Sequence, residues 1–83
     1  MNDAVGASSA FPLSLLQSGE NAVIVKVGGR GELHRHLETL GFVEGADVTV
    51  VSEAAGDLIV EVKGTQVALD RSVASRIMAR AAA

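Results

Sequence analysis

Hydrophobic and polar positions alternate with a period of two in the C-terminal half of the chain. Leu58, Val60 and Val62 alternate with Ile59, Glu61 and Lys63, and aliphatic residues return at positions 67 and 69 after Gly64. Such alternation is typical of half-buried strands, and a glycine-containing break between two such runs is typical of a hairpin. The pattern predicts a β-hairpin over residues 58–70, with its tight turn at Gly64-Thr65.

Two further apolar runs lie upstream of this hairpin. Residues 22–27 read AVIVKV, a run rich in β-branched residues that is interrupted only by Lys26. Residues 47–51 read DVTVV and place Val48 and Val50 on one face, after a turn at Gly45. Because β-branched residues favour the pleated backbone, the sequence predicts a strand over each run.

The segment 32–40 has a helical period instead. Leu33, Leu37 and Leu40 recur at i, i+4 and i+7, which gives a narrow apolar stripe. Gly41 follows, at the place where a residue in the left-handed conformation ends many helices. The spacing predicts a helix over residues 32–40 that ends at Gly41.

The segment 71–79 also shows a helical spacing. Val73 and Ile77 stand at i and i+4, and Asp70 is placed to cap the first turn. The pattern predicts a last helix over residues 71–79, followed by a frayed end from residue 80.

These elements make one small, mainly β domain with short helices. Their order is a turn near residues 11–16, a strand, one inserted helix, three antiparallel strands and one C-terminal helix. With short strands and an aliphatic core, a small partly open β-barrel is the expected architecture. Residues 1–10 lack periodicity and are expected to form a disordered tail, so the domain is expected to span residues 11–80.

Composition and charge exclude several classes of function. The 83 residues contain no cysteine, only two phenylalanines and no other aromatic residue, and the net charge is −3. Nucleic-acid binding needs a basic surface, so no nucleic-acid partner is expected. The aliphatic runs are far shorter than the ~20 residues that a membrane-spanning helix requires. No direct membrane insertion is therefore expected, and the absence of a secretion signal suggests a cytoplasmic protein.

The segment VKVGGRGELH resembles the glycine loop of a nucleotide site. A dinucleotide fingerprint needs G-x-G-x-x-G after a strand of a parallel sheet. Gly29 and Gly31 occupy the first two positions, but the third is His34, and the remaining strands are expected to be antiparallel. The glycines are better explained as a tight corner between a strand and a helix.

His34 and His36 are the only candidate metal ligands of their type. Residues two apart on a helix point about 200° from each other, so one helix cannot direct both imidazoles at the same ion. No metal site is predicted, although either histidine could bind a divalent ion adventitiously with Glu32, Glu38 or a second subunit. No cofactor is expected to be required.

No catalytic constellation is present in the sequence. The serines lack the context of an activated nucleophile, and the acidic residues are scattered rather than paired. The chain is therefore expected not to be an enzyme.

The chain resembles the ferrous iron transport protein A (FeoA) family over residues 11–79. The resemblance is carried mainly by LETLGFVEGADVTVV and GDLIVEVKGTQVAL in combination. The matching positions are mostly aliphatic residues and glycines: Leu37, Leu40, Gly41, Gly45, Val48, Gly56, Asp57, Gly64, Ala68, Leu69, Ala74 and Ile77. The resemblance implies an SH3-like β-barrel with appended helices. It also implies a small cytosolic accessory protein that binds and regulates the cytoplasmic part of the membrane transporter FeoB.

The resemblance also suggests which residues contact the partner. The candidates are Arg35, His36, Leu40, Gly41 and Phe42. Family members often carry basic residues on this helix, and Arg35 is expected to be exposed. Phe42 has two interpretations, because it could fill the core, which is commoner for phenylalanine, or anchor an interface.

Three further expectations concern the turns, the oligomeric state and an alternative function. Gly41, Gly45 and Gly64 are expected to be structural glycines that make the turns. The expected state is a monomer or a weak homo-oligomer. The alternative function is a transition-metal-binding protein, an iron carrier or sensor, with surface ligands at His34 and His36.

Overall fold

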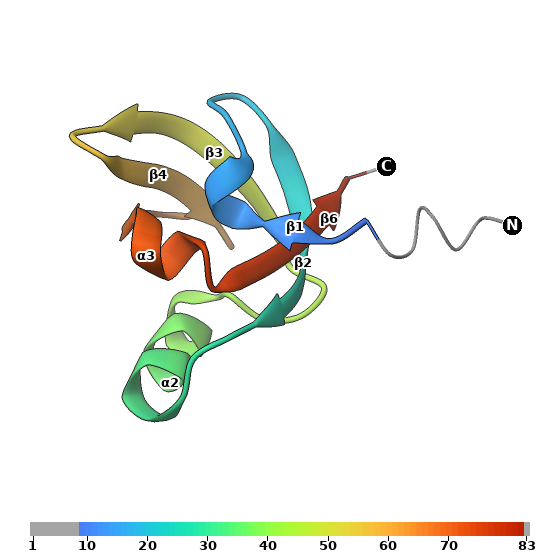
Figure 1. Ribbon diagram of the computed structural model, residues 1–83, viewed down its shortest axis with the longest axis vertical. Helices are drawn as coiled ribbons and strands as arrows, with labels where there is room; N and C mark the ends of the chain where they lie inside the picture. Colours follow the sequence, from blue (N-terminus) through green and yellow to red (C-terminus); the bar gives the residue numbers. More distant parts are fainter. Residues whose placement is uncertain (1–8, 83) are drawn as a thin grey trace, which may run out of the picture.

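Six strands and three short helical segments make up the computed structural model, which describes residues 9–82 (Figure 1). The tail predicted over residues 1–10 lies, up to residue 8, outside this range. The elements follow in the order β1 (Phe11–Pro12), 3-10 helix η1 (Leu13–Leu15), β2 (Asn21–Val27), α2 (Gly31–Leu40), β3 (Asp47–Ala54), β4 (Asp57–Val62), β5 (Thr65–Asp70), α3 (Arg71–Ala74) and β6 (Ile77–Ala81).

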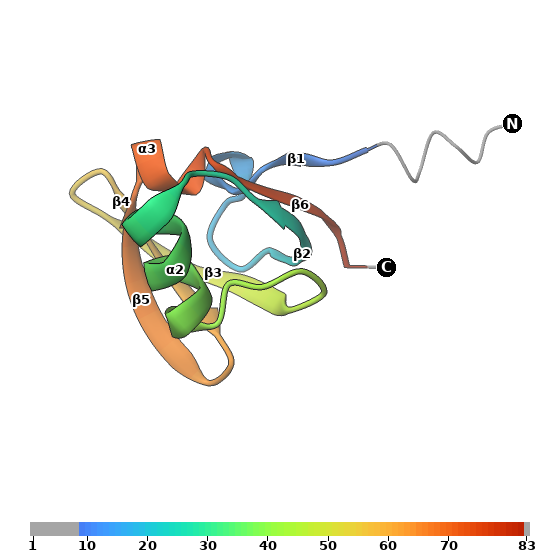
Figure 2. The ribbon, with the colours of Figure 1, turned by 90° about the horizontal axis from the view of Figure 1, so that it is seen from below.

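The strands form one antiparallel sheet in the order β1-β6-β2-β3-β4-β5. The sheet curls on itself, as Figure 2 shows from below, and buried apolar side chains fill its interior. Within the described residues no ladder joins β5 to β1, so the barrel is not fully closed. The predicted mainly β fold with a partly open barrel is confirmed.

The hairpin of β4 and β5 follows the predicted alternation. Leu58 pairs with Leu69, and Val62 pairs with Thr65. The turn lies one residue earlier than predicted, because Lys63 (φ 52°) and Gly64 (φ 79°) are its two central residues. Positive φ at both central positions is the mark of the type I′ turn, whose twist suits a two-residue hairpin.

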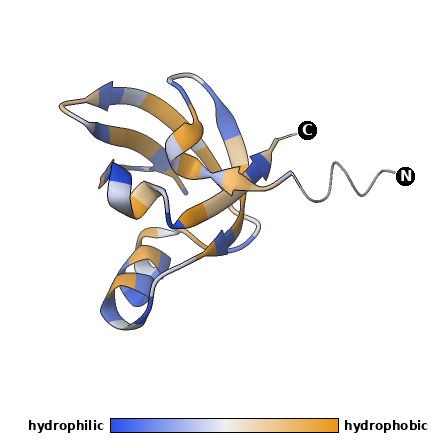
Figure 3. Cartoon of the chain, in the orientation of Figure 1, coloured by the Kyte–Doolittle hydropathy of each residue, from blue (hydrophilic) through white to orange (hydrophobic). Residues whose placement is uncertain are grey.

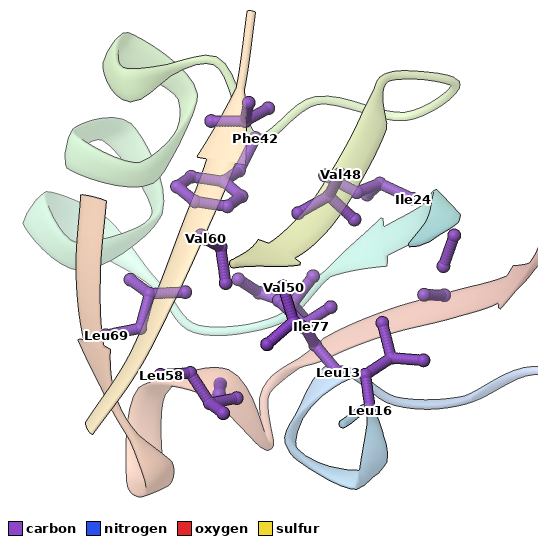
Figure 4. Packing of buried hydrophobic residues seen from close by; sticks show 14 of the residues in the cluster. Leu13, Leu16, Ile24, Phe42, Val48, Val50, Leu58, Val60, Leu69 and Ile77 are labelled. Atoms are coloured by element: carbon purple, nitrogen blue, oxygen red, sulfur yellow. The ribbon is translucent and has the colours of Figure 1, made fainter. Parts of the chain in front are cut away.

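The core is aliphatic apart from one ring. Fully or nearly fully buried side chains come from every strand except β1, and Phe42 is the largest of them (Figure 4). No polar or charged side chain among the described residues is buried. Coloured by hydropathy, the strands and α2 carry hydrophobic and hydrophilic residues in alternation (Figure 3). The buried set is Leu13, Leu16, Ala22, Ile24, Leu37, Phe42, Ala46, Val48, Val50, Leu58, Val60, Val62, Leu69, Ala74, Ile77 and Ala79.

The prediction for the C-terminal segment was wrong beyond Ala74. The helix α3 begins as predicted, with the Val73 amide donating to Asp70 Oδ1 at 2.8 Å, but it lasts one turn. Residues 77–81 then form β6, which lies between β1 and β2, so the chain is not frayed at residue 80. Ile77 and Ala79 are both fully buried. Burial of every second residue is typical of a strand, and the helical interpretation overlooked this spacing.

The helices are short. The longest, α2, has ten residues. Across residues 9–82, no helix has the length and the apolar character that crossing a membrane requires.

Candidate functional site

The helix α2 lies beyond the end of β2 (Figure 1). Of its ten residues only Leu37 is buried. The helix ends in a Schellman motif, in which the Gly41 amide donates to the Glu38 carbonyl (3.0 Å) and the Phe42 amide donates to the Leu37 carbonyl (2.9 Å). This motif turns the chain so that the side chain of Phe42 enters the core beneath the helix.

Burial excludes Phe42 as a surface anchor for a partner. Its side chain is fully buried, as expected if Phe42 fills the core. Leu40 and Gly41 are half-buried beside it. A Cβ atom on Gly41 would lie 2.8 Å from Lys63 Cγ, so this glycine is needed both for its φ of 111° and for close packing against the β4–β5 turn.

The other two glycines expected to be structural also have positive φ. Gly45 has φ 88° and Gly64 has φ 79°. A Cβ atom at either position would meet no atom within 4 Å, so backbone conformation and not space favours glycine there.

The glycine loop before α2 is a tight corner against β6. The Gly28 amide donates to the Arg76 carbonyl at 2.7 Å, and a Cβ atom on Gly28 would lie 2.9 Å from that oxygen. Gly29 (φ 92°) and Gly31 (φ 59°) then reverse the backbone into the helix. These contacts support the structural interpretation of the loop.

An open groove of about 320 Å³ lies between α2, the second half of β2 and the segment that follows α2. Its apolar side chains are those of three valines, and its polar lining is formed by two glutamates, a lysine and a histidine. The lining residues are Val25, Lys26, Val27, His34, Glu38, Phe42, Val43 and Glu44.

The structure separates the two histidines. His34 lines the groove, where its Nε2 lies 3.3 Å from Glu38 Oε2, one helical turn away. His36 is exposed and does not line the groove. In the part of the chain that the structure describes, no three His, Cys, Asp or Glu side chains are grouped to hold a metal ion.

The predicted partner-binding residues differ in their exposure. Arg35 and His36 are exposed on α2, outside the groove, whereas Phe42 faces the core. Sequence reasoning missed the groove residues Lys26 and Glu44. Lys26 was visible as the polar residue of its strand, but nothing local indicated that Glu44 lies near it.

A comparison with protein-family models matches residues 11–81 to the FeoA domain. Among curated proteins, the chain is 30% identical over 69 residues to a protein of Methanocaldococcus jannaschii assigned as Fe(2+) transport protein A. This alignment covers 82% of the chain and 83% of the relative.

A second curated relative is a fusion of Fe(2+) transport protein A with the Fe(2+) transporter FeoB, from Porphyromonas gingivalis. It is 49% identical over 39 residues, which are 47% of the chain and 5% of the fusion protein. The chain thus matches only a small part of that protein.

Among solved structures, the crystal structure of FeoA from Stenotrophomonas maltophilia superposes with a TM-score of 0.72 at 33% identity. The match covers 81% of the chain and 86% of that protein, which was crystallised with zinc and is described as an SH3 domain protein. The expected SH3-like barrel agrees with this description.

Proposed function

The chain belongs to the FeoA family, which takes part in Fe(2+) transport, and on this basis we propose that it binds and regulates the cytoplasmic part of a FeoB-type ferrous iron transporter. It acts there as a small cytoplasmic accessory protein, a monomer or a weak homo-oligomer. It carries out no chemical reaction and requires no cofactor.

The fusion relative carries this proposal. In the Porphyromonas gingivalis protein, transport protein A and the transporter FeoB are parts of one chain. Fusion keeps two modules at a high effective concentration, which is useful when the two act together. We expect this domain to associate with a transporter of the same type.

The surface of the described domain agrees with a binding role. The groove beside α2 combines exposed carboxylates with apolar side chains, and no buried polar side chain marks a reaction centre among residues 9–82. Regulation through contact needs only such a surface and a rigid barrel behind it.

The proposal is tested by titrating the full chain into the purified cytoplasmic domain of the transporter from the same organism. Saturable binding is expected, and deletion of the chain should lower ferrous iron uptake by cells that keep the transporter. Absence of binding up to about 1 mM, where the binding free energy would be only about −4 kcal/mol, would contradict the proposal.

A second function, surface binding of a transition metal, is favoured by two observations. His34 Nε2 and Glu38 Oε2 lie 3.3 Å apart on one face of α2, and the relative from Stenotrophomonas maltophilia was crystallised with zinc. Two ligands are fewer than the three or four that protein zinc sites usually supply, so any such binding would be weak.

Zinc titration followed by histidine NMR signals separates this second function from the first. His34→Ala should abolish the response, and His36→Ala is the matched control because His36 lies outside the groove. Binding that survives His34→Ala would exclude this pair as the metal site.

A further inference from the structure

The strand β2 loses one of its two neighbours halfway along its length. It pairs with β6 as far as Val27, which lies opposite Ile77. Its pairing with β3 ends at Val23, opposite Asp47. On this side of β2, one more residue is hydrogen-bonded to the segment before β3. The Ile24 amide donates to the Ala46 carbonyl (2.9 Å), and the Ile24 carbonyl accepts from the Gly45 amide (2.7 Å).

Beyond Ile24, the outer backbone edge of β2 is free. The Gly28 amide donates to the Arg76 carbonyl at 2.7 Å, so Gly28 faces β6. Successive residues of an antiparallel strand direct their N–H and C=O groups to opposite sides. The N–H and C=O of Val27 therefore point away from β6, and outside the strand ladders no backbone hydrogen bond within residues 9–82 involves them.

This free edge borders the groove described above. Val27 lines the groove together with Val25 and Val43, which give it apolar side chains. The wall opposite the strand is α2, which contributes His34 and Glu38. A strand edge that faces a helix across a groove is the arrangement by which some domains take up an extended peptide as an added strand.

The charged groups around the groove favour a basic occupant. Glu38 and Glu44 supply two carboxylates, against the single ammonium group of Lys26. Glu44 makes no ion pair with any described residue, and among these residues the Glu38 carboxylate is paired only with the His34 side chain. An incoming Lys or Arg side chain would therefore find a carboxylate that is not already neutralised.

We propose that this groove binds an extended, basic segment of a partner protein, which adds a short strand to the free edge of β2 at Val27. The segment's main chain pairs with the N–H and C=O of Val27. A Lys or Arg side chain of the segment lies against Glu38 and Glu44, and a neighbouring apolar side chain lies on the valines. The inference rests on the proposed function only for the identity of the partner, a cytoplasmic segment of the transporter.

The first experiment does not depend on the transporter. The full ¹⁵N-labelled chain is titrated with the synthetic peptide acetyl-Ala-Val-Lys-Val-Ala-amide and followed by NMR. Amide shifts are expected at residues 25–27, 38 and 44, with slower hydrogen exchange at Val27. A peptide with Glu in place of Lys should bind at least about fivefold more weakly, and N-methylation of the peptide backbone should abolish binding.

Two variants and a control test the role of charge. Glu44→Lys should weaken binding of the lysine peptide by about tenfold, and Lys26→Glu should strengthen it severalfold, since each changes the charge beside the incoming cation. Glu61→Lys is the matched control, because Glu61 is an exposed glutamate of β4 outside the groove and should leave binding unchanged.

The same variants are then titrated into the transporter's cytoplasmic domain. If the wild-type chain binds that domain and Glu44→Lys weakens binding, both proposals are supported. If the wild type binds and Glu44→Lys behaves like Glu61→Lys, the groove proposal is overturned and the proposed function stands. If the wild type does not bind, the proposed function fails, and the peptide titration alone decides on the groove.

The peptide titration has two outcomes that overturn the groove proposal. One is the absence of shifts at residues 25–27 with the lysine peptide at millimolar concentration. The other is a set of shifts at the same residues that depends on the concentration of the chain alone, which would assign the free edge to a second copy of the protein.

Discussion

The β3–β5 meander and the α2 arm (residues 28–46) differ in how many side chains they bury in the core. The meander buries six aliphatic side chains, at positions 48, 50, 58, 60, 62 and 69, and its ladders run from residue 48 to residue 70. The arm buries only Leu37, Phe42 and Ala46. The groove and the exposed His34–Glu38 pair both involve the arm. Stability is thus concentrated in the meander, and the candidate binding surface lies where few side chains fix the backbone.

The largest loss of stability is expected from Phe42→Ala, which truncates the largest buried side chain of the α2 arm. Truncating a fully buried phenylalanine should lower the free energy of unfolding by about 3–5 kcal/mol, because the ring is lost from the core and a cavity remains. Urea denaturation measures the change. Leu15→Ala is the control, because Leu15 is 67% exposed and its truncation should change stability by less than about 0.5 kcal/mol.

A loss below about 1 kcal/mol for Phe42→Ala would show that the arm is not held by this side chain. Hydrogen exchange in the same variant sharpens the comparison. Amides of α2 should lose protection before those of β4, since the arm has fewer buried contacts than the meander.

The next largest effect is expected from Gly41→Ala. A non-glycine residue in the left-handed region costs about 1–2 kcal/mol, and Gly41 has φ 111°. Gly45→Ala is the matched control, since Gly45 (φ 88°) has no atom near its would-be Cβ, whereas that of Gly41 lies 2.8 Å from Lys63 Cγ. Denaturation should therefore show the larger loss for Gly41→Ala. Equal losses would mean that Lys63 moves aside without cost.

These two regions also differ in how well the sequence predicts them. The meander was predictable, because a period of two determines both the strand and the face that is buried, and Gly64 indicates the turn. The helix α2 was predictable from its leucines. The strand β6 was not, because Val73 and Ile77 fit a helical spacing as well, and only pairing with the distant β2 decides between the two.

The candidate site was predictable only where helix geometry determines it. The separation of His34 and His36 follows from 3.6 residues per turn and agrees with the structure. The groove does not follow from any local pattern. It arises because the register of β2 against β6 shifts between Ile24 and Lys26 and because β3 leaves β2 after Val23, and both are long-range features.

A smaller effect is expected at the junction between the meander and α3. Asp70→Ala should cost about 1 kcal/mol, because Asp70 Oδ1 caps the Val73 amide at 2.8 Å. Asp70→Asn keeps a capping oxygen and removes one of two like charges that face each other across the ladder, since Asp70 pairs with Asp57. It should therefore be as stable as the wild type in urea denaturation. A loss equal to that of Asp70→Ala would show that the charge, not the cap, is what matters.

The smallest effect on stability is expected at the groove itself, with Glu38→Gln. The His34 and Glu38 side chains are 37% and 51% exposed, and exposed pairs one helical turn apart contribute only about 0.3–0.5 kcal/mol. Glu53→Gln, which removes the exposed pair with Arg71, is the control of similar size in urea denaturation. Glu38→Gln should nevertheless weaken binding of the lysine peptide, whereas Glu53→Gln should not. A change in binding without a change in stability distinguishes a recognition surface from a surface that stabilises the fold. A loss of stability above about 1 kcal/mol for Glu38→Gln would instead show that Glu38 has a structural role.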